Sequence, residues 1–343
     1  MSGLKTLRIG PLASIQDQGR PGQLQQGVSC SGAADLLALA EGAALLRQGA
    51  DLAALEMAGI GGLFEATGGL RIALTGAPMQ ASLDGEPLAW NASHQMQTGQ
   101  KLEIGAARKG VYGYLHLGGG IDSEVLLGAR SAHLMSGLGQ LVAAGDLLPC
   151  GPDRSREVGL GLLAEDRFQG GALRIVEGFQ SELFDAEVRA RFAHTAFKRG
   201  SRANRMGVEM ISDGAGFAAA GQLNILSEVI LPGDVQMTGD GKPFVLLREA
   251  QTTGGYPRIG TVLPCDLSKV AQAQAGVDLH FTWVSLEEGL AIQGKHDALV
   301  KALPAACKPL LRDPASMQDL LSYQLVGGVV SAQADPFDTG DIT

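Results

Sequence analysis

The chain has 343 residues, of which 45% are hydrophobic and 18% charged, a balance typical of a folded globular protein rather than a disordered one. Asp and Glu outnumber Lys and Arg by 36 to 27, and the net charge of −9 argues against binding to nucleic acid. No apolar run reaches the about 18 residues of a membrane-spanning helix, and the first residues lack the apolar core of a signal peptide, so we expect a cytoplasmic protein without a membrane role.

The first half of the chain predicts one helix among many short strands. Residues 4–9 indicate a strand, and residues 14–34 an irregular loop rich in Gly, Gln and Pro. Asp35 is placed to cap a helix over residues 36–47, because its carboxylate can accept a free amide of the first turn. Over residues 55–148, turn pairs separate short apolar runs, a pattern typical of a barrel or sandwich. One of these pairs, Asp84-Gly85, predicts a hairpin, since a type I′ turn needs two positive φ angles.

The second half continues the β pattern after a charged, glycine-rich boundary at residues 149–171. Residues 181–191 favour a short helix with acidic residues first and arginines last, an order that complements the helix dipole. Ser285 is expected to cap a helix, and residues 295–343 to form a helical extension with an acidic tail. Strands are expected at residues 173–176, 229–231, 235–237, 244–247 and 278–284.

Common catalytic signatures are missing from the sequence. It contains no P-loop, no complete dinucleotide fingerprint, no G-x-S-x-G and no H-E-x-x-H. The six histidines never fall close together, and the four cysteines are widely spaced, so neither a metal site nor a disulfide framework is predicted.

Three polar segments flanked by glycines are candidates for a binding site. The first, residues 14–35, contains Asp17 and Arg20 and favours either a surface loop or a substrate loop. The second joins Gly118, Gly119 and Gly120 to Arg130; it indicates either an anion cradle of backbone amides or a β-bulge with a solvated arginine. The third, residues 249–258, crowds hydroxyls, an amide and a Gly pair at the end of an apolar run, preceded by I-L-S-E at 225–228.

These segments resemble the family of allophanate hydrolase subunit 2 and the 5-oxoprolinase C subunit, also described as biotin-dependent carboxyltransferase-like or KipA-type proteins. In the first half the resemblance rests on S-I-Q-D-Q-G-R-P-G (14–22), V-S-C-S-G-A-A-D (28–35), A-L-E (54–56), L-T-G-A (74–77), G-G-I-D (119–122) and L-G-A-R-S (127–131). In the second half it rests on N-R-M-G (204–207), I-L-S-E (225–228), P-G-D-V-Q (232–236), D-G-K-P (240–243) and Q-T-T-G-G-Y-P (251–257). Each motif alone is weak, but the ordered set is specific.

The resemblance implies a mainly β fold with a few helices, built from two β-barrel-like halves of which the C-terminal one is cyclophilin-like. We therefore expect a β-rich domain with one early helix over residues 1–150, the cyclophilin-like barrel over residues 171–290, and the helical extension and tail over residues 291–343.

The resemblance also implies a function within a complex. Family members act with a subunit 1 protein (of the KipI type, or the B-type subunit of 5-oxoprolinase) and a third subunit (LamB/YcsF type) that together hydrolyse 5-oxoproline, a lactam, to glutamate with ATP. Alternatives are a carboxyltransferase component of a urea or amide carboxylase, with biotin carried on another protein, and a non-catalytic regulator of the subunit 1 protein. ATP is the expected cofactor, bound by this chain or by a partner.

Opening a lactam with ATP requires groups that bind anions and a carboxylate that activates water. We assign these two roles to residues of the polar segments. We expect Glu228, Glu249 or Asp17 as the base, the three glycines 118–120 as the nucleotide cradle, and one cavity shared by Arg20, Arg130 and Thr252. The expected substrate binders are Arg20, Arg130, Arg205, Gln251, Thr252, Thr253 and Arg258.

The sequence departs from the family pattern at a few positions. Glu209 stands where the family usually has an arginine, two residues after the glycine of N-R-M-G, which reverses the charge near the expected pocket. Glu249 stands where Asp is usual, a chemically mild change.

Overall fold

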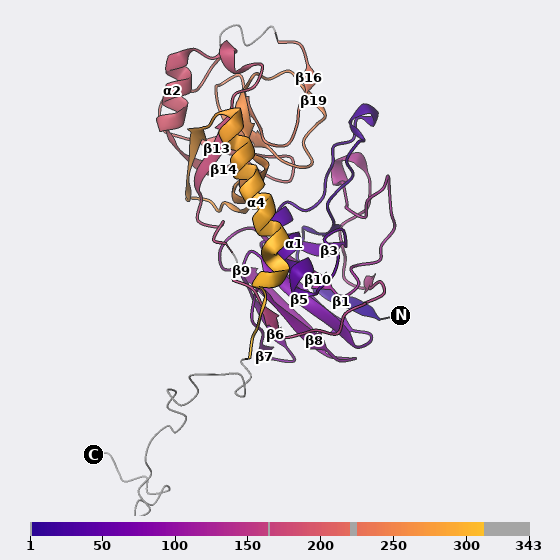
Figure 1. Ribbon diagram of the computed structural model, residues 1–343. Helices are drawn as coiled ribbons and strands as arrows, with labels where there is room; N and C mark the ends of the chain where they lie inside the picture. Colours follow the sequence, from indigo (N-terminus) through magenta and orange to yellow (C-terminus); the bar gives the residue numbers. More distant parts are fainter. Residues whose placement is uncertain (1, 164, 220–224, 312–343) are drawn as a thin grey trace, which may run out of the picture.

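The computed structural model of the chain describes residues 2–163, 165–219 and 225–311. The C-terminal tail expected beyond residue 311 lies outside these residues. The described part consists of two β-rich halves joined by helices (Figure 1), so the mainly β fold expected from the sequence is confirmed. No described helix combines the length and the apolar character that crossing a bilayer requires.

The first half contains two antiparallel sheets that face each other across an apolar core. One sheet has the order β11 (Leu147–Pro149), β1 (Gly3–Ile9), β4 (Gly62–Ala66), β9 (Lys101–Ala107), β6 (Met79–Leu83) and β7 (Glu86–Pro87). The other has the order β2 (Ala13–Gln16), β3 (Ala54–Ala58), β10 (Tyr112–Leu117), β5 (Leu70–Gly76), β8 (Ala92–Met96), β12 (Leu160–Gly161) and β22 (Lys308–Pro309). Phe64 of the first sheet and Leu74 and Leu115 of the second are fully buried in the shared core, as period-2 alternation requires.

The second half is a closed barrel of seven strands. Around the barrel they run β13 (Gly171–Val176), β20 (Arg258–Val262), β17 (Asp234–Met237), β18 (Pro243–Leu246), β15 (Gly207–Ile211), β14 (Ala196–Ala203) and β21 (Asp278–Trp283). β21 closes the barrel by pairing in parallel with β13. Phe192, Phe197 and Phe281 pack in the interior with ring centroids 4.5–5.2 Å apart.

Helices cover the sheets and connect the two halves. α2 (Ala186–His194) and α3 (Leu267–Gln272) pack on the barrel, and a ribbon of β16 (Glu228–Val229) and β19 (Thr253–Gly254) lies outside it. α1 (Leu36–Leu45) covers the first half. In Figure 1, α4 (Leu286–Ala306) extends from the barrel along α1 toward the first half. Leu303 and Cys307, at the end of α4, share a core with Leu45 of α1.

Local signals in the sequence predicted several of these elements correctly. Asp35 accepts the Ala38 amide at 3.2 Å and caps α1, and Ser285 forms a capping box with Glu288 at the start of α4. Asp84 and Gly85 have φ angles of 50° and 92° and join β6 to β7, as expected of a type I′ hairpin.

Two elements differ from the sequence prediction. β2 overlaps the start of residues 14–34, which were expected to be loop throughout, because its strand character comes from pairing with β3. The helix expected at residues 181–191 is a short 3₁₀ turn, Ser181–Leu183, followed by α2, which begins at Ala186.

Candidate functional site

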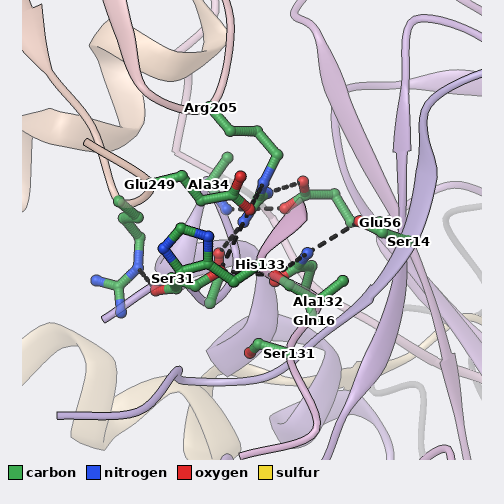
Figure 2. A network of polar contacts seen from close by, with 12 residues as sticks. Ser14, Gln16, Ser31, Ala34, Glu56, Ser131, Ala132, His133, Arg205 and Glu249 are labelled. Carbon is green, nitrogen blue, oxygen red and sulfur yellow. Dashed lines mark hydrogen bonds and ion pairs between the residues drawn. The ribbon is translucent and has the colours of Figure 1, made fainter. Parts of the chain in front are cut away.

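A network of polar contacts occupies the junction between the two halves (Figure 2). Its centre is Arg205, in the tight turn between β14 and β15. Asn204 fixes this turn, because its side-chain oxygen accepts the amides of Met206 (2.8 Å) and Gly207 (3.3 Å). The turn therefore projects Arg205 away from the barrel toward the first half.

Arg205 joins carboxylates from both halves. Its Nε donates to Glu249 Oε1 at 2.7 Å, its Nη1 donates to Glu56 Oε1, and its Nη2 donates to the Gly32 carbonyl at 2.5 Å. The Glu56 and Glu249 side chains are only 2% and 3% exposed. Burial alone would lower the pKa of Arg205, but these two carboxylates raise it above its usual value. The Arg205 guanidinium therefore stays charged at every physiological pH.

Glu56 is fully committed to this bridge. It lies on β3 opposite Tyr114 of β10. Its Oε2 accepts the Tyr114 hydroxyl at 2.6 Å and the Ala34 amide at 2.8 Å. Burial and then the Glu56 charge raise the pKa of Tyr114 well above its usual value, so the hydroxyl remains a donor. Glu56 thus positions Arg205 and the loop before α1.

Glu249, in contrast, keeps one oxygen free. Its Oε1 accepts Arg205 and the Ser31 hydroxyl at 3.3 Å, whereas its Oε2 has no partner among the described residues. Ser31 belongs to the loop between β2 and α1, which is tied to the barrel by Arg248: the Arg248 Nε donates to the Ser31 carbonyl at 2.6 Å. The junction therefore holds Glu249 in a fixed position with a spare acceptor.

A cavity of about 250 Å³ lies beside the bridge, lined by residues of both halves. Its polar lining includes Glu249, Arg205, Tyr112 and Arg199. Burial and then the nearby Glu56 carboxylate raise the pKa of Tyr112 to about 12, so its hydroxyl stays protonated at neutral pH. The apolar lining consists of Leu12, Ala58, Val111, Leu134, Met135, Leu141, Ala203 and Met206. Apolar walls with a few convergent polar groups are typical of small-molecule sites, which makes this cavity the candidate functional site.

The expected site residues of the first half hold a loop together. Asp17 accepts the Gly19 amide at 2.7 Å, the Arg130 amide at 2.6 Å and the Ser131 hydroxyl. Arg20 is 1% exposed and donates to the carbonyls of Leu126 (3.3 Å) and Ser131. With its carboxylate bonded this way, Asp17 positions the loop, and its role as a base stays a prediction.

Arg130 and the glycines at 118–120 lie outside the junction cavity. Arg130 pairs with Asp122 at 2.7 Å and lines a separate cavity of about 580 Å³. The amides of Gly118, Gly119 and Gly120 donate to the Arg71 carbonyl, the Gln48 side chain and the Leu117 carbonyl at 2.8, 3.0 and 2.8 Å. A phosphate at these glycines would have to displace hydrogen bonds that the fold already makes.

The remaining expected residues lie along the ribbon outside the barrel. Glu228 is exposed and accepts Arg258 at 2.5 Å, and the two line a cavity of about 430 Å³. Thr253 pairs with Val229 across the ribbon, and Thr252 accepts the Ile230 amide through its carbonyl at 3.1 Å. Gln251 is exposed and lines a fourth cavity, of about 620 Å³.

The structure therefore brings together only some of the expected residues. Arg205 and Glu249 meet at the junction, and Arg20 is buried in the adjoining loop. Arg130 and Thr252 do not line the junction cavity, and none of the cavities described above is lined by Arg20, Arg130 and Thr252 together. The reason is that glycine-rich turns occur at several separate corners of the two halves, and sequence does not show which corners converge.

Three residues of the site escaped the sequence analysis: Glu56, Tyr112 and Arg199. The sequence did contain a signal for Arg199, because strand alternation places it on the same face of β14 as Phe197, which points into the barrel. A charged side chain at an inward position is unusual enough to single out. Tyr112 and Glu56 carry no comparable local signal.

Glu209, the departure from the family pattern, has a partner within the barrel wall. Its Oε1 accepts Arg202 Nη2 at 2.5 Å and Nε at 3.1 Å. The hydrogen bonds from Arg202 lower the pKa of the Glu209 carboxyl, which stays ionised. Its charge is therefore paired locally with Arg202, and Glu209 is not among the residues that line the junction cavity. Within the described ranges, no group of three or more His, Cys, Asp or Glu is placed to hold a metal ion.

Comparison with known proteins agrees with this architecture. The family model for the carboxyltransferase domain, subdomains A and B, matches residues 26–283. The chain belongs to this carboxyltransferase-domain family. It is 35% identical to the 5-oxoprolinase C subunit of Escherichia coli (strain K12) over 294 residues, which cover 84% of this chain and 93% of that protein. It is 30% identical to the Haemophilus influenzae protein of the same name, over 85% of this chain and 94% of that one. The resemblance found in the motifs is thus confirmed.

Solved structures of other carboxyltransferase-domain proteins share the fold. The protein TTHA0988 matches with a TM-score of 0.75 and 30% identity over 82% of this chain, and the match spans 56% of that longer chain. The Kluyveromyces lactis urea carboxylase matches with a TM-score of 0.78 and 23% identity over 91% of this chain and 31% of its own. The second likeness concerns the fold alone.

Proposed function

We propose that this chain is the C-type subunit of a 5-oxoprolinase complex that hydrolyses 5-oxoproline to glutamate with ATP. One observation carries the proposal: the chain aligns with 93% and 94% of the length of two proteins that are named as C subunits of 5-oxoprolinase. By contrast, it aligns with only 14% of the urea amidolyase of Saccharomyces cerevisiae. A match to nearly the whole of a subunit favours the same role more than a match to one segment of a larger enzyme.

The reaction breaks the lactam C–N bond. ATP transfers its terminal phosphoryl group to the carbonyl oxygen and leaves as ADP. Water adds to the carbonyl carbon, and the C–N bond then breaks as the ring nitrogen takes a proton, which leaves an acyl phosphate. A second water hydrolyses the acyl phosphate to the glutamate carboxylate and phosphate. Glu249 suits the proton transfer, because it lines the cavity and its Oε2 is unbonded among the described residues. Arg205 pairs with Glu249 and holds it in place. We place the ATP site on a partner, since the amides of glycines 118–120 are already bonded within this chain.

The partners in this proposal are the subunit 1 protein, which is the B-type subunit of 5-oxoprolinase, and the third subunit. As part of the same proposal, we expect the complex to be cytoplasmic and the barrel of the second half to be cyclophilin-like. The alternative is a carboxyltransferase component that uses carboxybiotin delivered by another protein, and the description of the matching family favours it. A regulator that only binds the subunit 1 protein is the third possibility.

Reconstitution of the three subunits tests the proposal directly. The complex should release glutamate from 5-oxoproline only when ATP is present, and Glu249→Gln should lower the turnover about 100-fold or more, the usual contribution of a general base. Glu86→Gln, an exposed position on β7, is the matched control and should leave turnover unchanged. Biotin-dependent carboxylation of an amide would transfer the assignment to the alternative. Partner binding without either activity would favour the regulator.

A further inference from the structure

Arg199 is a cation without a counter-ion in the junction cavity. It comes from β14, is half-buried and lines the cavity together with Tyr112. Within the described part of the chain its guanidinium makes no ion pair, and its buried Nε has no hydrogen-bond partner. Arg205, the other arginine of the cavity, differs in that two carboxylates and a carbonyl already occupy it.

An unpaired, partly desolvated arginine is costly to a fold. A guanidinium stays charged at all physiological pH values, and removing it from water without an acceptor forfeits hydrogen bonds that water would supply. Burial lowers the pKa of Arg199, and among the described residues the ion pairs of Glu56 and Glu249 are made with Arg205 and not with Arg199. The two carboxylates of the Arg205 bridge therefore do not serve as its counter-ions. The donors of Arg199 remain available to a ligand.

The cavity is lined by both a cation and a carboxylate that can interact with a ligand. Arg199 supplies a positive charge and unused donors, while Glu249 supplies a carboxylate oxygen without a partner among the described residues. The rest of the lining includes Tyr112 and apolar residues such as Val111 and Leu141. At about 250 Å³ the cavity is smaller than the about 300–1,000 Å³ of drug-sized sites, so it suits a small ligand.

We propose that Arg199 binds the carboxylate of a small carboxylic acid in the junction cavity and so selects anionic substrates over neutral amides. Within the function proposed above, on which this identification of the ligand rests, the acid is 5-oxoproline. Its carboxylate pairs with Arg199, and its lactam group lies toward Glu249. A neutral amide such as urea lacks the group that Arg199 recognises, because the planar guanidinium fork matches a carboxylate.

The inference is tested by measuring the affinity of the full chain for 5-oxoproline and for 2-pyrrolidinone. The second compound is the same lactam ring without the carboxylate. Wild type should prefer 5-oxoproline, and Arg199→Gln should weaken 5-oxoproline binding roughly 10- to 100-fold, the range of a charged hydrogen-bonded contact, while 2-pyrrolidinone binding stays the same. Arg199→Lys should recover part of the preference. Lys198→Gln is the matched control, since Lys198 is the exposed neighbour on the same strand, 3.9 Å from Asp278.

The reconstituted complex gives a second readout for any variant whose binding is too weak to titrate. Arg199→Gln should raise the KM for 5-oxoproline and leave the KM for ATP unchanged. Equal 5-oxoproline binding, or an equal KM, in Arg199→Gln and wild type overturns the inference even if glutamate is formed. Arg199-dependent binding of other small carboxylates by a complex that forms no glutamate keeps the inference and rejects the proposed function. Absence of carboxylate binding by both chain and complex rejects both.

Discussion

At the scale of single residues, the choice of glycine at position 42 depends on a residue that is distant in the sequence, His116. Gly42 lies in α1, and a Cβ atom there would stand 2.3 Å from three atoms of the His116 ring, which is buried in β10. Such a contact forces the ring or the helix to move. Gly42→Ala should therefore lower the free energy of unfolding by about 1–3 kcal/mol, as overpacking of a core does, although alanine favours helices.

Gly294 provides the matched control for this prediction. It lies in the interior of α4, and a Cβ atom there would meet no atom within 4 Å. Gly294→Ala should raise the free energy of unfolding by about 0.5–1 kcal/mol, because glycine is the poorer helix former. Urea denaturation of both variants would test the pair, and a stabilising Gly42→Ala would refute the close contact with His116.

His116 makes stability depend on pH in a predictable direction. Burial lowers the pKa of His116 to about 3, from an ordinary value of 6.5. The Thr75 hydroxyl donates its proton to the Ala38 carbonyl. His116 Nε2, 2.8 Å from the same hydroxyl oxygen, is therefore the donor of the hydrogen bond between them. The unfolded chain therefore binds one more proton than the folded one between pH 6.5 and pH 3, and stability falls as the pH is lowered through this window.

The histidine contribution to that loss should amount to about 2 kcal/mol between pH 7 and pH 5. Because other groups also titrate, the measurement is the difference between wild type and His116→Phe, whose ring cannot take a proton. The free energy of unfolding of wild type should fall more steeply between pH 7 and pH 5 than that of the variant. Parallel pH profiles would show that His116 is not protected from protonation.

At the scale of elements, α1 is held in place by a buried ion cluster that could not be predicted from its sequence. Arg167, from the segment between the halves, donates to Asp35 Oδ2 at 2.6 Å and to both oxygens of Glu41 at 2.9 and 2.8 Å. All three side chains are at most 3% exposed. Burial raises the pKa of Glu41, while Arg167 acts against this effect. The segment after β12 is thereby fastened to the first turns of α1.

Arg167→Met should be among the more damaging substitutions in the chain. It leaves Asp35 and Glu41 buried without their cation, and breaking such a pair from one side costs about 3–5 kcal/mol. Arg156→Ala, at an exposed arginine shortly before β12, should change the free energy of unfolding by about 0.5 kcal/mol or less. Chemical denaturation at pH 7 would compare the two, and similar small losses would show that the cluster contributes little.

Elements with local signals were predictable, and those that depend on remote pairing were not. α1 and α4 have their own caps at Asp35 and Ser285, so their starts could be predicted from neighbouring residues. β2 has only four residues and exists because β3, about 40 residues later, supplies its partner strand. A sequence without an alignment holds no comparable information on that pairing.

At the scale of the whole molecule, the same limit applies to the candidate site. Arg205 was expected to bind an anion and Glu249 to act as a base, and the structure brings the two together. The third residue of the ion bridge, Glu56, is 149 positions from Arg205 in the sequence and was not predicted to be a site residue. Its motif, A-L-E, identified the family but gave no reason for a carboxylate inside a strand. Convergence of the two halves, rather than any motif, creates the bridge.

The bridge should therefore be important for the stability of the entire chain. Arg205→Met removes the cation that pairs with both Glu56 and Glu249, and we expect a loss of about 3–5 kcal/mol in the free energy of unfolding at pH 7. Arg205→Lys should lose less, because an ammonium keeps the charge but cannot reproduce the planar fork of donors. Arg8→Met breaks an exposed pair, with side chains 61% and 56% exposed, and should cost about 1 kcal/mol or less. Unfolding of Arg205→Met at the same urea concentration as Arg8→Met would contradict this prediction. The two halves would then be held together by their shared apolar core, to which Tyr112 and Tyr114 contribute. The ion bridge would in that case serve only the chemistry of the cavity.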